Sequence, residues 1–225
     1  MAQPLERRRF LSGAGALGLG LGLTNGLSLG TAKAMPVPGI FNTTETRKEG
    51  LRPFPKWNGA LEKYFEERMD TPGTCADPEF NRCHYQEWHA ELDRLRGRDP
   101  KIQMKEINRF MNAHRYIVDP VNWGVLDYWA SPGEFFQRQG DCEDYAIAKF
   151  LSLRILELPA DEMRVVILND LNLRVAHAIL AIYIDSEVMV LDNQLSIMIE
   201  ARRIRHYQPI YSVNETGWWK HKPVL

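Results

Sequence analysis

The stretch "RQGDCEDYAIAKFLSLRILEL", residues 138 to 158, decides the fold expected for this 225-residue chain. Gly140 closes the preceding segment, and Asp141 is a favourable N-cap for a helix that begins at Cys142. Apolar residues cover most of the surface of this helix rather than a single stripe. We therefore expect the helix to be buried against other elements.

The segments before and after this helix differ in the spacing of their apolar residues. Helical spacing before it predicts helices over residues 59–70, 85–97, 101–117 and 132–139. Beyond Pro159 the spacing changes to that of strands, over residues 164–168, 174–184, 187–193 and 208–213. Helices first and strands second indicate an α+β fold.

The first 34 residues have the composition of an export signal. A positive stretch, "ERRRF", precedes a glycine-rich, weakly apolar segment and the small-x-small sequence of residues 32–34. Arg7 and Arg8 match the twin-arginine export motif, with Arg9 at its variable position. A membrane anchor is the alternative, but the glycine content leaves no clean span of about 20 apolar residues. We expect export to the periplasm by the twin-arginine route.

The rest of the chain carries a small negative charge. Without residues 1–34, which contain four bases and one acid, 24 bases face 28 acids. This balance gives no reason to expect nucleic acid as a partner, and no membrane span is expected. Residues 35–57 are rich in proline, glycine and threonine, and we expect an extended arm that lies on the domain.

Three cysteines in an exported protein predict one disulfide and one unpaired thiol. Cys75 and Cys83 enclose seven residues, a spacing that suits a short loop closed by a disulfide. The alternative is a metal site built from the same pair with His84 and His89, but it lacks the close cysteine pair of common zinc sites. Either way, Cys142 is left unpaired.

A histidine and an acid are expected to meet in the hairpin that follows. If Asp185 and Ser186 form a two-residue turn, His177 lies diagonal to Asp192 on one face, within reach of a hydrogen bond. A satisfied core histidine is the alternative for His177. With the lone thiol of Cys142 at a helix N-terminus, the pattern predicts a Cys–His–Asp triad.

Three acids surround this cysteine, although negative charge disfavours a thiolate. Asp141, Glu143 and Asp144 have a plain explanation as helix-capping residues. Calcium binding is the other explanation, because this ion binds carboxylate oxygens and its positive charge would offset the negative charge of the acids. The nucleophile would then work well when calcium is bound.

The sequence resembles the bacterial transglutaminase-like cysteine proteinases, and among them the LapG-like periplasmic proteases. The resemblance covers roughly residues 50–220 and lies in "DYWASPGEFFQRQGDCEDYAIAKFLSL", "VAHAIL", "VLDN" and "YQPIYSVNETGWW". It implies a papain- or transglutaminase-like domain over residues 58–225, with the cysteine helix packed on an antiparallel sheet. It also implies Cys142 as nucleophile, His177 as base and acid, Asp192 as its orienting group, and calcium beside them.

The resemblance further implies a protein substrate and a regulator. LapG-like proteases cut large surface adhesins, which controls biofilm attachment, and an inner-membrane receptor for cyclic-di-GMP holds them back. Two other functions stay open: acyl transfer to an amine, as in transglutaminases, and a non-catalytic, calcium-stabilised envelope protein that binds a partner. The expected function is a calcium-dependent cysteine endopeptidase of the periplasm.

Overall fold

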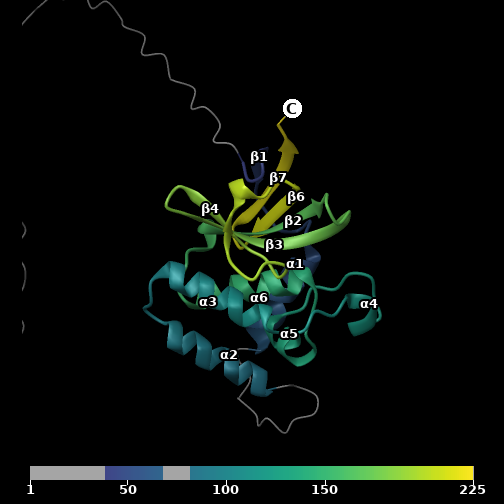
Figure 1. Ribbon diagram of the computed structural model, residues 1–225. Helices are drawn as coiled ribbons and strands as arrows, with labels where there is room; N and C mark the ends of the chain where they lie inside the picture. Colours follow the sequence, from purple (N-terminus) through teal and green to yellow (C-terminus); the bar gives the residue numbers. More distant parts are fainter. Residues whose placement is uncertain (1–38, 68–81, 225) are drawn as a thin grey trace, which may run out of the picture. The chain divides into compact units, whose positions relative to one another are not determined.

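The computed structural model describes residues 39–67 and 82–224. Apart from the first strand, the main helices come before the strands in the chain (Figure 1). The helices are α1 (Pro55–Glu67), α2 (Arg82–Leu95), α3 (Pro100–Asn112), α4 (Asp119–Asn122), α5 (Pro132–Arg138), α6 (Cys142–Ile155) and two 3-10 turns, η1 (Ala160–Glu162) and η2 (Ala201–Arg203). The strands are β1 (Thr43–Lys48), β2 (Met163–Asp170), β3 (Val175–Ile184), β4 (Glu187–Leu191), β5 (Ile199–Glu200), β6 (Tyr207–Asn214) and β7 (Gly217–Pro223).

All seven strands form one antiparallel sheet with the order β1-β7-β6-β2-β3-β4-β5. The α+β expectation is therefore confirmed. Strands β1, β5 and β7 were not predicted, because β5 is two residues long and β1 and β7 have no clear alternation of apolar residues. The described part of the expected arm, residues 39–57, contributes the edge strand β1 and the first turn of α1.

Two apolar clusters lie on the two faces of the sheet. Alternate residues of β2 face opposite ways, so that Val165 belongs to the larger cluster and Val166 to the smaller one. The larger cluster joins the sheet to the helices, and α6 packs on β3 and β2 within it. In Figure 1 the helices gather on one side of the sheet.

Helix α6 is buried along almost its whole length, as its sequence predicted. It also packs on α3 and α5, which complete its surroundings. Because α6 is fixed between the sheet and these helices, the position of its first residue, Cys142, is set by the core.

Candidate active site

The chain turns sharply into α6 at Gly140. A Cβ atom at this position would collide with the side chain of Asp144, so glycine is required for close approach rather than for an unusual φ. The Asp144 carboxylate accepts hydrogen bonds from the N–H of Asp141 at 3.1 Å and from that of Ala130 at 2.7 Å. Asp144 thus ties the start of α6 to the loop before α5.

The hairpin between β3 and β4 has the predicted register. Leu180 pairs with Leu191 and Ile184 with Glu187, around a turn in which Asp185 and Ser186 both have positive φ. The predicted hydrogen bond is present: Nε2 of His177 lies 3.0 Å from Oδ1 of Asp192, and both side chains are buried.

Asp192 has two further hydrogen bonds that orient it. The Tyr207 hydroxyl donates to Oδ2 at 2.6 Å, and the N–H of Gln194 donates to Oδ1 at 2.9 Å. Burial alone would raise the pKa of Asp192, but the hydrogen bonds from His177 and from these two donors bring it below its usual value. Tyr207 was missed because the predicted strand began one residue later, and no local pattern links it to the acid.

The sulfur of Cys142 lies beside β3. Its thiol donates to Oε2 of Glu143 at 3.1 Å. The backbone N–H of Ala178, the residue after His177, lowers the pKa of the thiol by a smaller amount than burial raises it. No hydrogen bond joins the sulfur to His177 among the described residues, and Nδ1 of His177 has none there either. Burial, with the charge of Glu143 beside it, raises the pKa of Cys142 well above its usual value. In this arrangement the sulfur is held as a thiol.

The acidic cluster is larger than the sequence suggested. Within the described ranges, ligand atoms lie within 4.8 Å of one another in three sets: Asp141, Cys142 and Glu143; Asp119, Asp141 and Asp144; and Asp119, Asp127 and Glu143. Asp119, the first residue of α4, lies 23 residues before Cys142, and Asp127 lies 15 residues before it. The sequence pattern does not fix the course of the chain between them and the cysteine. Tertiary folding brings them beside the helix start.

Burial raises the pKa values of these acids. Burial together with the hydrogen bond and charge of Asp141 raises the pKa of Glu143 to about 9. Burial also raises the pKa of Asp119, Asp141 and Asp144. Oδ1 of Asp119 and Oδ1 of Asp141 are buried without a hydrogen-bond partner. Buried, unpaired carboxylate oxygens beside one another fit a divalent cation such as calcium.

Asp144 differs from the other predicted ligands. Both of its oxygens accept backbone N–H groups, so the capping explanation applies to this residue. Asp119 and Asp141 each keep one buried oxygen without a hydrogen-bond partner. Glu143 and Asp127 lie within the same cluster, although Glu143 accepts from the Cys142 thiol and Asp127 accepts from Nε1 of Trp129.

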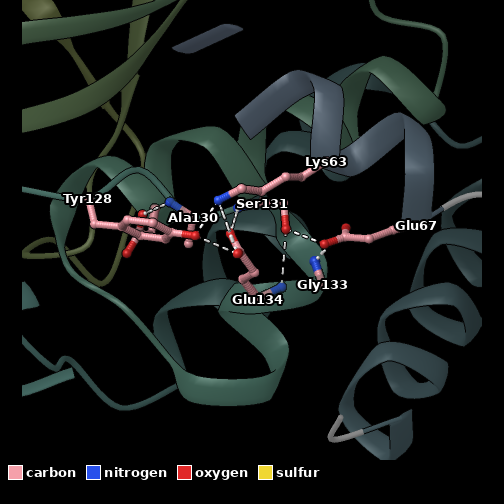
Figure 2. A network of polar contacts seen from close by, with 8 residues as sticks. Lys63, Glu67, Tyr128, Ala130, Ser131, Gly133 and Glu134 are labelled. Atoms are coloured by element: carbon pink, nitrogen blue, oxygen red, sulfur yellow. Dashed lines mark hydrogen bonds and ion pairs between the residues drawn. The ribbon is translucent and has the colours of Figure 1, made fainter. Parts of the chain in front are cut away.

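A polar network holds residues 128–134, which follow Asp119 and Asp127 in the chain, against α1 (Figure 2). Lys63 of α1 donates to the Tyr128 hydroxyl and to Glu134, while Glu67 accepts from Ser131 and from the N–H of Gly133. The backbone N–H of the same Tyr128 donates to Oδ2 of Asp119 at 2.5 Å. The network therefore fixes the loop that brings Asp119 and Asp127 to the cysteine.

Comparisons with known proteins assign the family. The model of the bacterial transglutaminase-like cysteine proteinases (BTLCP) matches residues 75–221, most of the chain. The structure is also similar to that of Legionella pneumophila LapG, with 33% identity, a TM-score of 0.59, and coverage of 71% of this chain and 87% of LapG. The chain belongs to the bacterial transglutaminase-like cysteine proteinases. It is accordingly a cysteine protease with a transglutaminase-like fold.

Two further LapG structures from the same organism resemble this BTLCP member. The calcium-bound form has 32% identity and a TM-score of 0.59, covering 71% of this chain and 87% of that one. The EGTA-treated form has 33% identity and the same TM-score, covering 71% and 84%. No match is found among curated proteins.

The other predicted features of this protease lie partly outside the described residues. The export signal and Cys75 are outside them, and the side chains of Cys83 and His84 are not described, so the predicted disulfide stays a prediction. Cys142 is a free cysteine, half-buried. Within residues 39–67 and 82–224, no helix is long and apolar enough to cross a membrane.

Proposed function

We propose that this cysteine protease is a calcium-dependent endopeptidase of the periplasm that uses Cys142, His177 and Asp192 as its triad. One observation carries the proposal. Asp192 holds Nε2 of His177, which leaves Nδ1 without a hydrogen-bond partner in the described structure, while the backbone N–H of the next residue, Ala178, acts on the Cys142 thiol. In the reacting state, the Cys142 side chain would leave Glu143 and turn its sulfur to this free nitrogen.

The triad then performs peptide hydrolysis in two stages. The Cys142 thiol gives its proton to Nδ1 of His177, and the sulfur attacks the carbonyl carbon of the substrate. His177 returns the proton to the leaving amine, and a thioester remains on Cys142. Water, deprotonated by His177, then attacks the thioester; the bond to sulfur breaks, the acid product leaves, and His177 returns the proton to the Cys142 sulfur. The backbone N–H of Cys142, at the helix start, is placed to stabilise the oxyanion.

The acidic cluster gives the protease its calcium dependence. Asp119, Asp127, Asp141 and Glu143 would hold the ion. When bound, calcium supplies positive charge that keeps these carboxylates ionised. Glu143, once ionised and engaged in this way, no longer accepts the proton of the Cys142 thiol, which is then available to His177.

Substrate cleavage tests the catalytic proposal. Wild type and Cys142→Ala would be incubated with the N-terminal part of a large surface adhesin, in calcium or in chelator, and the products weighed by mass spectrometry. We expect cleavage by the wild type in calcium alone, with one water added at the cut bond. Full cleavage by Cys142→Ala would overturn the triad, and products joined to an amine would indicate acyl transfer instead.

Metal binding tests the enlarged ligand set. Terbium luminescence would be titrated on the wild type, on Asp119→Asn and on Asp93→Asn, whose carboxylate lies on α2 and pairs with Arg96. We expect Asp119→Asn to weaken binding at least tenfold and Asp93→Asn to leave it unchanged. Equal affinity in all three proteins would remove Asp119 from the site.

Substrate, location and regulation follow the resemblance to LapG-like proteases. That resemblance supports an adhesin as substrate, biofilm attachment as the process, and an inner-membrane cyclic-di-GMP receptor as regulator. Export would be tested with Arg7→Lys/Arg8→Lys, which should keep the protein out of the periplasmic fraction, whereas Arg9→Lys at the variable position should not. Periplasmic accumulation of the double variant would exclude the twin-arginine route.

A further inference from the structure

A lysine is buried in the core beneath the proposed triad. The side chain of Lys149, on α6, has no exposed surface. Its Nζ atom has no hydrogen-bond partner among the described residues, and the Tyr145 ring, one turn earlier on the helix, lies 5.8 Å away. An ammonium group in such surroundings has lost its water without gaining an acceptor.

Lys149 is directed to the same side of α6 as the nucleophile. It follows Cys142 by seven residues, which is two helical turns and returns to nearly the same face. Helix α6 packs on β3, the strand that carries His177, and on β2. The lysine therefore lies on the side of the helix that meets the strands of the triad.

Asp192 is the charged group whose field acts on Lys149 in the described structure. No carboxylate of α3, α5, β2 or β3, the elements that pack on α6, acts on it in this way. The carboxylate of Asp192 is already bound by His177, Tyr207 and the N–H of Gln194. The two groups thus interact through space rather than by a hydrogen bond.

Packing stability does not account for a lysine at this position. A methionine has a similar length and would fill the same space without an unpaired charge, and replacing buried charges by apolar residues is often stabilising. Burial lowers the pKa of Lys149 to about 7, and the attraction of Asp192 offsets only part of that change. The charge of this group therefore changes near neutral pH.

We propose that Lys149 is a positioning residue that sets the proton affinity of His177 through Asp192. This inference rests on the proposed triad. A positive charge at Lys149 stabilises the Asp192 carboxylate and opposes a positive charge on His177. A neutral amine lets Asp192 support the imidazolium fully. The Tyr207 ring lies 5.8 Å from the His177 ring, and Leu168 of β2 is the neighbour of His177 in the sheet.

Opposite substitutions should move His177 in opposite directions. The pKa of His177 would be measured by NMR of isotope-labelled histidine in Cys142→Ala, where no thiol titrates, with and without changes at Lys149. We expect Lys149→Met to raise the pKa of His177 by about half a unit or more, because a positive charge is removed. Lys149→Arg stays charged at every pH used. It should lower the pKa of His177, or leave that pKa at the value it has when Lys149 is protonated.

A neighbouring buried residue provides the control. Ser152 lies on the same helix, is fully buried, and binds Nε1 of Trp88 at 2.8 Å. Ser152→Ala should disturb the core and leave the pKa of His177 unchanged. An unchanged value in both Lys149 variants, or a fall in Lys149→Met, would overturn the inference. Because the readout needs no substrate, failure of the proposed peptidase function would appear separately, as lack of cleavage by the wild type.

Discussion

Three hydrogen bonds fix the Asp192 carboxylate before any substrate arrives. One comes from His177, and the others come from the Tyr207 hydroxyl and the N–H of Gln194. A carboxylate held on both oxygens cannot rotate freely, so the imidazole that it binds keeps one orientation and one tautomer. At the scale of single residues, Tyr207 therefore belongs with the proposed triad.

Tyr207→Phe should lower kcat/KM by about tenfold to a hundredfold, since it removes a hydrogen bond to a charged group while keeping the ring. The measurement is peptide cleavage under calcium-saturated conditions. Tyr211→Phe, four residues along the same strand, is the matched control and should stay close to the wild type. The melting curves of both variants show whether a loss of activity is caused by unfolding instead.

At the scale of elements, the site depends on how α6 begins. Gly140 allows the Asp144 side chain to cover the turn, and Asp144 in turn binds the N–H groups of Asp141 and Ala130. The network on α1 in Figure 2 holds Ser131, Gly133 and Glu134, which follow Ala130 in the chain. The thiol of Cys142 and the acids of the helix start are thus positioned by the turn at Gly140.

Two glycines with different surroundings test this dependence. Gly140→Ala should lower the free energy of unfolding by a few kcal/mol, because the new Cβ would displace the buried Asp144 carboxylate. Gly59→Ala lies inside α1, where a Cβ meets no atom within 4 Å, and should be neutral or stabilising by up to about 1 kcal/mol. Urea unfolding of both variants measures the difference, and equal destabilisation would contradict the role given to Gly140.

At the scale of the whole molecule, the acidic cluster links stability to pH and, through the proposed metal site, to calcium. The folded, metal-free protein holds Glu143 with a pKa near 9, against an ordinary value of 4.5. Between these values the folded state binds more protons than the unfolded state, so stability falls as pH rises. Lys149, with its pKa near 7, is protonated in both states below that pH and adds no slope there.

In chelator, the melting temperature should therefore fall between pH 5 and pH 7, and calcium should remove most of this fall by binding the ionised carboxylates. Thermal unfolding at several pH values, with and without calcium, measures both effects. Glu143→Gln should flatten the curve in chelator, because it removes the carboxyl group whose pKa is raised to about 9. A melting temperature that rises with pH in chelator would contradict the arrangement of the cluster.

Features governed by neighbouring residues could be read directly from the sequence. The buried helix from Cys142, the α+β order and the register of the β3–β4 hairpin follow from periodicity and from a two-residue turn. The alternation of side chains between the two faces of this hairpin also predicted that His177 and Asp192 meet. The structure adds α4, which lies between the helices predicted over 101–117 and 132–139, and α1 begins at Pro55, four residues before the predicted helix.

Features that join distant segments were decided only by the tertiary structure. Strand β1 pairs with β7 from the other end of the chain, and Asp119 and Asp127 reach the acids of α6 across a loop. The partnership of Tyr207 with Asp192 and the isolation of the Lys149 ammonium likewise depend on packing. Periodicity reports which face of an element is apolar, whereas the identity of the groups that meet there depends on how the elements pack together.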